Sequence, residues 1–191
     1  MTLQATRPLY TRRRFTVDEY YRLAEVGILR EDERVELVDG EIIVMSPIGR
    51  LHAADVDRLG DLFVITFRDS AQVRVQNPLR LDEHSEPQPD VMLLRRKPDF
   101  YRSGHPRPED VLLLVEVADS TLAYDREVKL PLYARFGIPE VWLLDVENDA
   151  IVAHRDPSPD GYRTRLIVRR GASLAPLAFP GRELAVAEML G

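Results

Sequence analysis

The sequence predicts an α/β domain in which a mixed β-sheet is flanked by helices, with an N-terminal helix and a β-hairpin in front of it. Two aliphatic runs, 91–94 and 111–115, have the continuous apolar character of strands buried on both faces. A third run at 140–145 follows a helical pattern, and this strand–helix–strand order predicts a parallel crossover connection. Asp39-Gly40, between two short strand-like segments, is a strong hairpin signal.

At the N-terminus we expect residues 1–14 to form an arm and residues 15–191 to fold as one domain. Thr16 and Glu19 have the spacing of a capping box, in which the threonine hydroxyl and the glutamate carboxylate satisfy the first helical amides. The helix that follows is expected to end near Gly27.

Hydrophobic periodicity and turn residues place the remaining elements. We expect hairpin strands at 34–39 and 41–45, a helix at 50–67, short strands at 72–76 and 78–81, a surface loop at 95–110, a helix at 123–136, a second hairpin at 150–156 and 161–169, and a terminal helix at 184–190. All of these belong to one domain, because no linker or internal repeat interrupts them.

The amino-acid composition limits the kinds of nucleic-acid binding and of metal site that the chain can form. The formal net charge of −6 argues against a protein that coats nucleic acid through bulk charge, although it leaves a local basic groove open. The chain has no cysteine, so a metal site would need oxygen or imidazole ligands, which points to Mg²⁺ or Mn²⁺. Without a secretory signal or a segment of membrane-spanning length, we expect a cytoplasmic protein.

Two carboxylates accompany the buried strands. Asp90 stands just before the first strand, after Pro89, and Glu116 interrupts the second. An ionised glutamate is rarely buried without a partner, and a metal ion is a common way to hold two carboxylates together. If the two strands present Asp90 and Glu116 side by side, these residues can chelate a divalent cation.

The next helix adds three polar residues at four-residue spacing, Asp125, Lys129 and Tyr133. If this helix packs over the end of the Glu116 strand, Lys129 can reach the same site, where it would orient a water or stabilise a phosphorane charge. The alternative is a surface ion pair between Asp125 and Lys129, worth a few tenths of a kcal/mol. Spacing alone favours the ion pair.

Together these motifs resemble the PD-(D/E)XK nuclease superfamily, and more narrowly its Uma-type bacterial family of restriction-endonuclease-like proteins. The resemblance rests on Pro89-Asp90, on Glu116-Val117, on the Asp125…Lys129…Tyr133 series, and on the sequences ELVDGEIIVMSP and GIPEVWLLD. It implies a restriction-endonuclease-like core, with Asp90 and Glu116 in the metal-ligand positions. The lysine of the usual motif falls on Ala118 here, and the resemblance implies that Lys129 replaces it.

Three further residues have both a functional and a structural interpretation. Strand alternation places Glu36 opposite Val35 and thus toward solvent, whereas the resemblance makes it an accessory ligand or a water-orienting acid. His52, at a helix start, is either a surface residue or a contact to substrate or metal. Tyr133 either contacts a phosphate through its hydroxyl or packs in the core.

The resemblance therefore implies a Mg²⁺-dependent endonuclease that hydrolyses DNA, with Mn²⁺ as a substitute ion. Its catalytic residues would be Asp90, Glu116 and Lys129. A homodimer is expected for an enzyme that cuts two strands. Two alternatives remain: a catalytically silent binding or regulatory module with the same fold, and a nuclease that acts on RNA or on another phosphoester.

Overall fold

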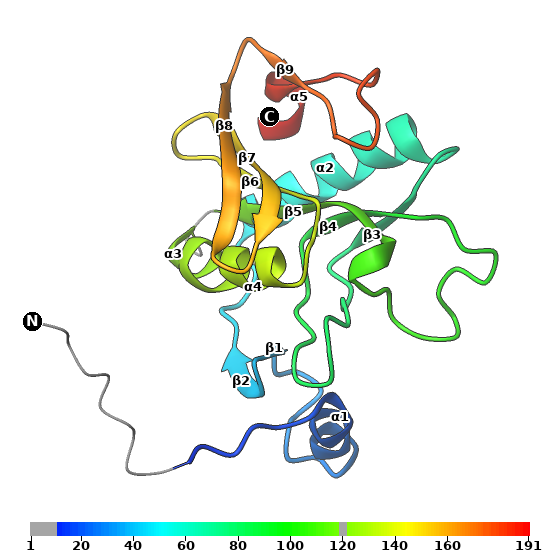
Figure 1. Ribbon diagram of the computed structural model, residues 1–191, viewed down its shortest axis with the longest axis vertical. Coiled ribbons are helices and arrows are strands. Elements are labelled where there is room, and N and C mark those ends of the chain that lie inside the picture. The colour runs from blue at the N-terminus through cyan, green and yellow to red at the C-terminus, as the bar shows by residue number, and fades with distance from the viewer. Residues whose placement is uncertain (1–10, 119–121) are drawn as a thin grey trace, which may run out of the picture.

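The computed structural model describes residues 11–118 and 122–191, so most of the expected N-terminal arm lies outside the described residues. Within them, six strands form one mixed sheet in the order β3-β4-β5-β6-β7-β8 (Figure 1). The strands span β3 Gln72–Val75, β4 Val91–Leu94, β5 Val111–Ala118, β6 Glu140–Asp145, β7 Ala150–Ser158 and β8 Gly161–Arg169. The pair β5–β6 is parallel and the other pairs are antiparallel, which confirms the predicted mixed sheet.

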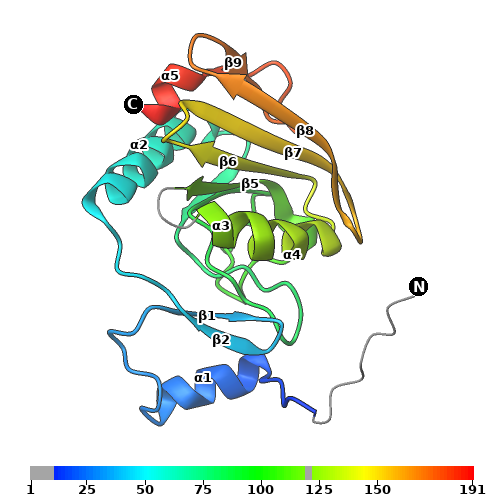
Figure 2. The ribbon, with the colours of Figure 1, turned by 90° about the vertical axis from the view of Figure 1, so that its left-hand side faces the viewer.

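Helices cover both faces of this sheet. On one face lie α2, Arg50–Phe67, and α5, Val186–Leu190, which pack against alternate strand residues such as Val115, Val117 and Trp142. The other face is covered by α3, Leu122–Tyr124, and α4, Leu130–Arg135 (Figure 2). Because side chains alternate along a strand, Leu114 and Glu116 of β5 point toward the α4 face.

The N-terminal helix and hairpin contact the loop at 83–88, and the hairpin also contacts Lys129 and Arg135 on this second face. Helix α1, Val17–Glu25, begins with the predicted capping box of Thr16 and Glu19. Strands β1, Val35–Val38, and β2, Glu41–Val44, pair in antiparallel register. Gly40 in their turn has φ +77°, and a Cβ atom there would lie 2.4 Å from the Arg14 Cβ, so only glycine fits.

The helix expected at 123–136 contains an irregularity that the sequence pattern did not predict. Between α3 and α4 the segment Asp125–Lys129 forms a π-helical turn, closed by a hydrogen bond from the Leu130 amide to the Asp125 carbonyl. Pro131 lies just inside α4 and has no amide hydrogen to donate to the preceding turn. The wider turn brings both Asp125 and Lys129 into the interior, where both are buried.

Smaller elements complete the chain and correct three expectations. A 3₁₀ turn at Pro108–Asp110 interrupts the predicted loop, and β9, Ser173–Leu174, pairs with β10, Leu184–Ala185. The terminal helix therefore starts at Val186 rather than at 184. Residues 78–81 form no strand, because Leu79 and Leu81 bond to the loop that leads toward Asp90. No helix among the described residues is long and apolar enough to cross a membrane.

Candidate active site

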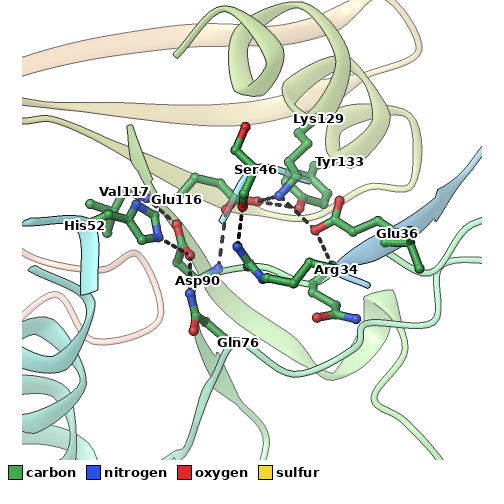
Figure 3. Close-up of polar contacts among 12 residues, drawn as sticks. Arg34, Glu36, Ser46, His52, Gln76, Asp90, Glu116, Val117, Lys129 and Tyr133 are labelled. Atoms are coloured by element: carbon green, nitrogen blue, oxygen red, sulfur yellow. Dashed lines mark hydrogen bonds and ion pairs between the residues drawn. The ribbon is translucent and has the colours of Figure 1, made fainter. Parts of the chain in front are cut away.

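The register between β4 and β5 brings the two predicted carboxylates together. Val91 pairs with Val115 in an antiparallel ladder, so the next positions, Asp90 and Glu116, lie opposite each other. The Asp90 amide donates to Glu116 Oε2 over 3.3 Å. Both residues fall on the sheet face that α4 covers, at the end of the strands where the hairpin approaches (Figure 3).

Asp90 is held by three donors from three different segments. His52 Nε2 of α2 lies 3.0 Å from Oδ1, Gln76 Nε2 lies 3.2 Å from the same oxygen, and the Val117 amide donates to Oδ2 over 2.9 Å. Burial raises the pKa of Asp90, but the hydrogen bond and charge of His52, together with the Val117 amide, outweigh burial and hold the pKa below its usual value. The carboxyl group is therefore ionised and fixed in orientation.

Glu116 is 2% exposed and receives contacts on both oxygens. The Tyr133 hydroxyl donates to Oε1 over 2.6 Å, and Lys129 Nζ lies 3.2 Å from the same oxygen. Burial raises the pKa of Glu116 well above its usual value, and Asp125 and Asp90 add to this, while Lys129 opposes it. Tyr133 is fully buried, so the structure places its hydroxyl on Glu116 and away from the surface.

Lys129 reaches the cluster from the π-helical turn and is 3% exposed. Its ammonium group lies between two carboxylates, 3.2 Å from Glu116 Oε1 and 3.3 Å from Glu36 Oε1. Burial alone would lower the pKa of Lys129, but the charges of Glu116 and Glu36 outweigh burial and raise the pKa above its usual value. The side chain is thus a buried cation and not the surface partner of Asp125 that spacing alone had favoured.

Strand alternation predicted that Glu36 faces solvent, and this prediction is wrong. Glu36 is 3% exposed, because strand β1 is covered on both faces. Its Oε1 contacts Lys129 and also accepts from the Gln88 amide over 3.1 Å. Its other oxygen, Oε2, is buried and has no hydrogen-bond partner among the described residues.

These side chains open onto one cavity of about 140 Å³, which is large enough for an ion with waters or for a phosphate group. Most of the charged residues in its walls are acidic, and the cations beside them are Lys129 and Arg34 (Figure 3). The lining residues are Arg34, Glu36, Met45, Ser46, Pro47, Ile48, Gly49, His52, Gln88, Asp90, Glu116, Asp125 and Lys129.

The donor set suits a hard divalent cation that is only partly held by protein. Across residues 11–118 and 122–191, no three histidine, aspartate or glutamate side chains are grouped closely enough to bind a metal by themselves. Asp90 and Glu116 nevertheless supply two carboxylates at the cavity wall. Mg²⁺ is commonly bound in this way, with waters and substrate phosphates completing its coordination.

Four residues of the site were not singled out from the sequence as site residues. Gln76 orients Asp90, and its φ of +48° is unusual for a residue other than glycine. Gln88 contributes through its backbone amide, so its side-chain identity carries no signal. Arg34 and Asp125 enter the cavity wall, the latter through the π-helical turn. The exposed Arg34 could have been noticed because it lies two residues before Glu36 and so shares its side of the strand.

The mixed sheet thus brings a carboxylate beside β4 and one within β5 together with a lysine of the next helical segment. The chain belongs to the Uma2 family, described as "Putative restriction endonuclease", whose sequence model matches residues 17–187. No curated protein matches the chain.

Among solved structures, the following shows the same fold. It is that of "a putative nuclease belonging to DUF820" from Anabaena variabilis ATCC 29413, with a TM-score of 0.69 and 14% sequence identity. The match covers 92% of this chain and 97% of the other. At this identity the similarity establishes the architecture, including the N-terminal helix and hairpin.

Proposed function

We propose that this protein is a Mg²⁺-dependent endonuclease that hydrolyses phosphodiester bonds of DNA, with Mn²⁺ able to replace Mg²⁺. The observation that carries the proposal is the meeting of Asp90, Glu116 and Lys129 at one cavity, although they come from three separate segments. Membership of the restriction-endonuclease family supports the same reaction class.

Asp90 and Glu116 are the residues that would hold the metal ion. When bound there, the ion supplies positive charge to a phosphoryl oxygen and makes a bound water more acidic. The protein keeps both carboxylates in place beforehand: His52 and Gln76 fix Asp90, and Tyr133 fixes Glu116. We therefore assign His52 and Tyr133 to positioning.

Lys129 and Glu36 act on the water and on the phosphate. An ammonium group between two carboxylates is a hydrogen-bond donor, so Lys129 orients a water or stabilises negative charge on phosphorus and does not accept a proton. Glu36 Oε2 is the acceptor of this cavity that is left without a partner among the described side chains, and it can accept a hydrogen bond from the attacking water.

The test is cleavage of single-stranded DNA, duplex DNA and RNA in Mg²⁺ or Mn²⁺ by the wild type and by Asp90→Asn. Asp69→Asn, at an exposed aspartate, is the matched control. Loss of a residue that only supports a metal ligand already costs about tenfold to a hundredfold in metal affinity or activity. Asp90→Asn should therefore lose more than about a hundredfold in cleavage activity while the fold persists.

Preferential cleavage of RNA would show that the substrate is RNA and not DNA. A wild type that cuts none of these nucleic acids would contradict the proposal and favour a catalytically silent module. The homodimer that we propose for double-strand cleavage is tested separately by light scattering on the full chain, where a monomer at assay concentration would contradict it.

A further inference from the structure

The acidic residues of the cavity would repel the phosphate group of a substrate. Its walls carry Glu36, Asp90, Glu116 and Asp125, and a phosphodiester would add another negative charge beside them. Lys129 is buried at the inner wall and shared between Glu36 and Glu116, so it can act on a phosphate only from inside the cavity. A metal ion between Asp90 and Glu116 would offset part of this charge, but a substrate phosphate also needs donors on its outer side.

Arg34 is placed to supply them. It immediately precedes β1 on the same side of the chain as Glu36, and its carbonyl accepts from the Met45 amide over 2.8 Å, which ties it to the end of the hairpin. Its side chain turns toward the cavity, where Nη1 donates to the Ser46 carbonyl over 2.8 Å (Figure 3). Within 11–118 and 122–191, this carbonyl is the one acceptor hydrogen-bonded to its guanidinium group.

A guanidinium group has five N–H donors in a planar fork that matches two phosphate oxygens. One contact to Ser46 holds the fork at the cavity mouth and leaves donors for a ligand. Gly49 is the N-cap of α2 and gives it no side-chain cap, and Ile48, Gly49 and His52 line the same cavity, so the positive end of this 18-residue helix also borders it. The mouth is thus cationic, whereas the interior is acidic and includes the unpartnered Oε2 of Glu36.

We propose that Arg34 binds a phosphate of the substrate at the cavity mouth and thereby places the phosphodiester against Asp90 and Glu116. This inference rests on the proposed function, because it names the group that the same site recognises. The ligand class is a phosphodiester monoanion, and the contact is made by the guanidinium fork. Arg34→Lys keeps the charge but loses the fork, and Arg34→Gln loses both.

The test uses dimethyl phosphate, the simplest phosphodiester, titrated in the presence of Mg²⁺ and followed by NMR of the histidine rings. His52 lines the cavity, while the other three histidines do not, so they serve as internal references. Arg30→Gln is the control variant, because Arg30 lies in the same segment but pairs with Asp32 outside the cavity. We expect the dissociation constant to rise by about tenfold to a hundredfold in Arg34→Gln, less in Arg34→Lys, and not in Arg30→Gln.

Cleavage kinetics on duplex DNA give a second readout, in which Arg34→Gln should raise KM by a similar factor. Two results would overturn the inference even if the wild type cuts DNA. Dimethyl phosphate could leave the His52 signals of the wild type unchanged, or it could shift them equally in the wild type and in Arg34→Gln. Binding that depends on Arg34 in a protein that cuts no nucleic acid would uphold the inference and refute the proposed function. If Arg34 only holds Ser46, then Arg34→Gln lowers Tm with unchanged phosphate affinity, which also overturns the inference.

Discussion

Replacing Lys129 by methionine tests whether the buried cluster is held together by this one ammonium group. Methionine has a similar length and suits an apolar interior, so the change removes charge with little loss of volume. The ammonium group lies 3.3 Å from Glu36 Oε1 and 3.2 Å from Glu116 Oε1, and all three residues are at most 3% exposed. Its loss would leave two buried carboxylates without their shared cation.

Breaking a buried ion pair by removing one partner typically costs about 3–5 kcal/mol, because the remaining charge stays buried and uncompensated. In a chain of this size, about 1 kcal/mol lowers Tm by roughly 2–4 °C, so the expected decrease is roughly 6–20 °C. Adding Glu36→Gln to Lys129→Met should recover part of this loss, since it removes one of the stranded charges.

Urea unfolding at neutral pH provides the assay. The single tryptophan, Trp142, is fully buried, so its fluorescence reports unfolding of the core directly. A decrease in the midpoint with an unchanged slope would show a loss of stability without a change in the unfolded state. Lys129→Met with wild-type stability, or a double variant less stable than the single one, would refute the electrostatic reasoning.

Two further predictions concern Tyr133 and His154. Tyr133→Phe deletes the hydroxyl that donates to Glu116 over 2.6 Å. It should lower the free energy of unfolding in urea by about 1.5–3 kcal/mol and change kcat more than KM. Unchanged stability and kcat would contradict this positioning role. Burial, with the charges of Arg165 and Arg126, lowers the pKa of His154 to about 4 from 6.5. The unfolded chain therefore takes up this proton first, and wild-type stability should fall between about pH 6.5 and 4. His154→Gln should flatten that decline, and an identical pH profile would count against the assignment.

Much of this architecture follows from local sequence signals. The Asp39-Gly40 turn, the capping box of Thr16 and Glu19, and the periodicity of 50–67 each determine an element without help from distant residues. The pairing of Asp90 with Glu116 was also expected, because each adjoins or lies within a buried strand, and the observed register sets them opposite each other.

The rest depends on tertiary contacts that no local pattern contains. Strand alternation predicted an exposed Glu36, but β1 is buried on both faces. This burial depends on where the hairpin packs, which no local pattern contains. Lys129 enters the cluster through a π-helical turn, whose only local signal is Pro131. Gln76 donates to Asp90 from a residue with φ +48°, and Gln88 acts through its backbone amide, so neither contact follows a local sequence pattern.

The central claim is that Asp90 and Glu116 form a divalent-cation site that serves phosphodiester hydrolysis. Its most direct test is calorimetric titration of Mg²⁺ or Mn²⁺ into the wild type and into Glu116→Gln, alone and with a short duplex that carries a non-hydrolysable linkage. Glu127→Gln, at an exposed position of the next helix, is the matched control. We predict saturable binding in the wild type and the control, tighter with duplex present, and its loss in Glu116→Gln. Equal binding in Glu116→Gln, or no binding by the wild type even with duplex, would contradict the claim.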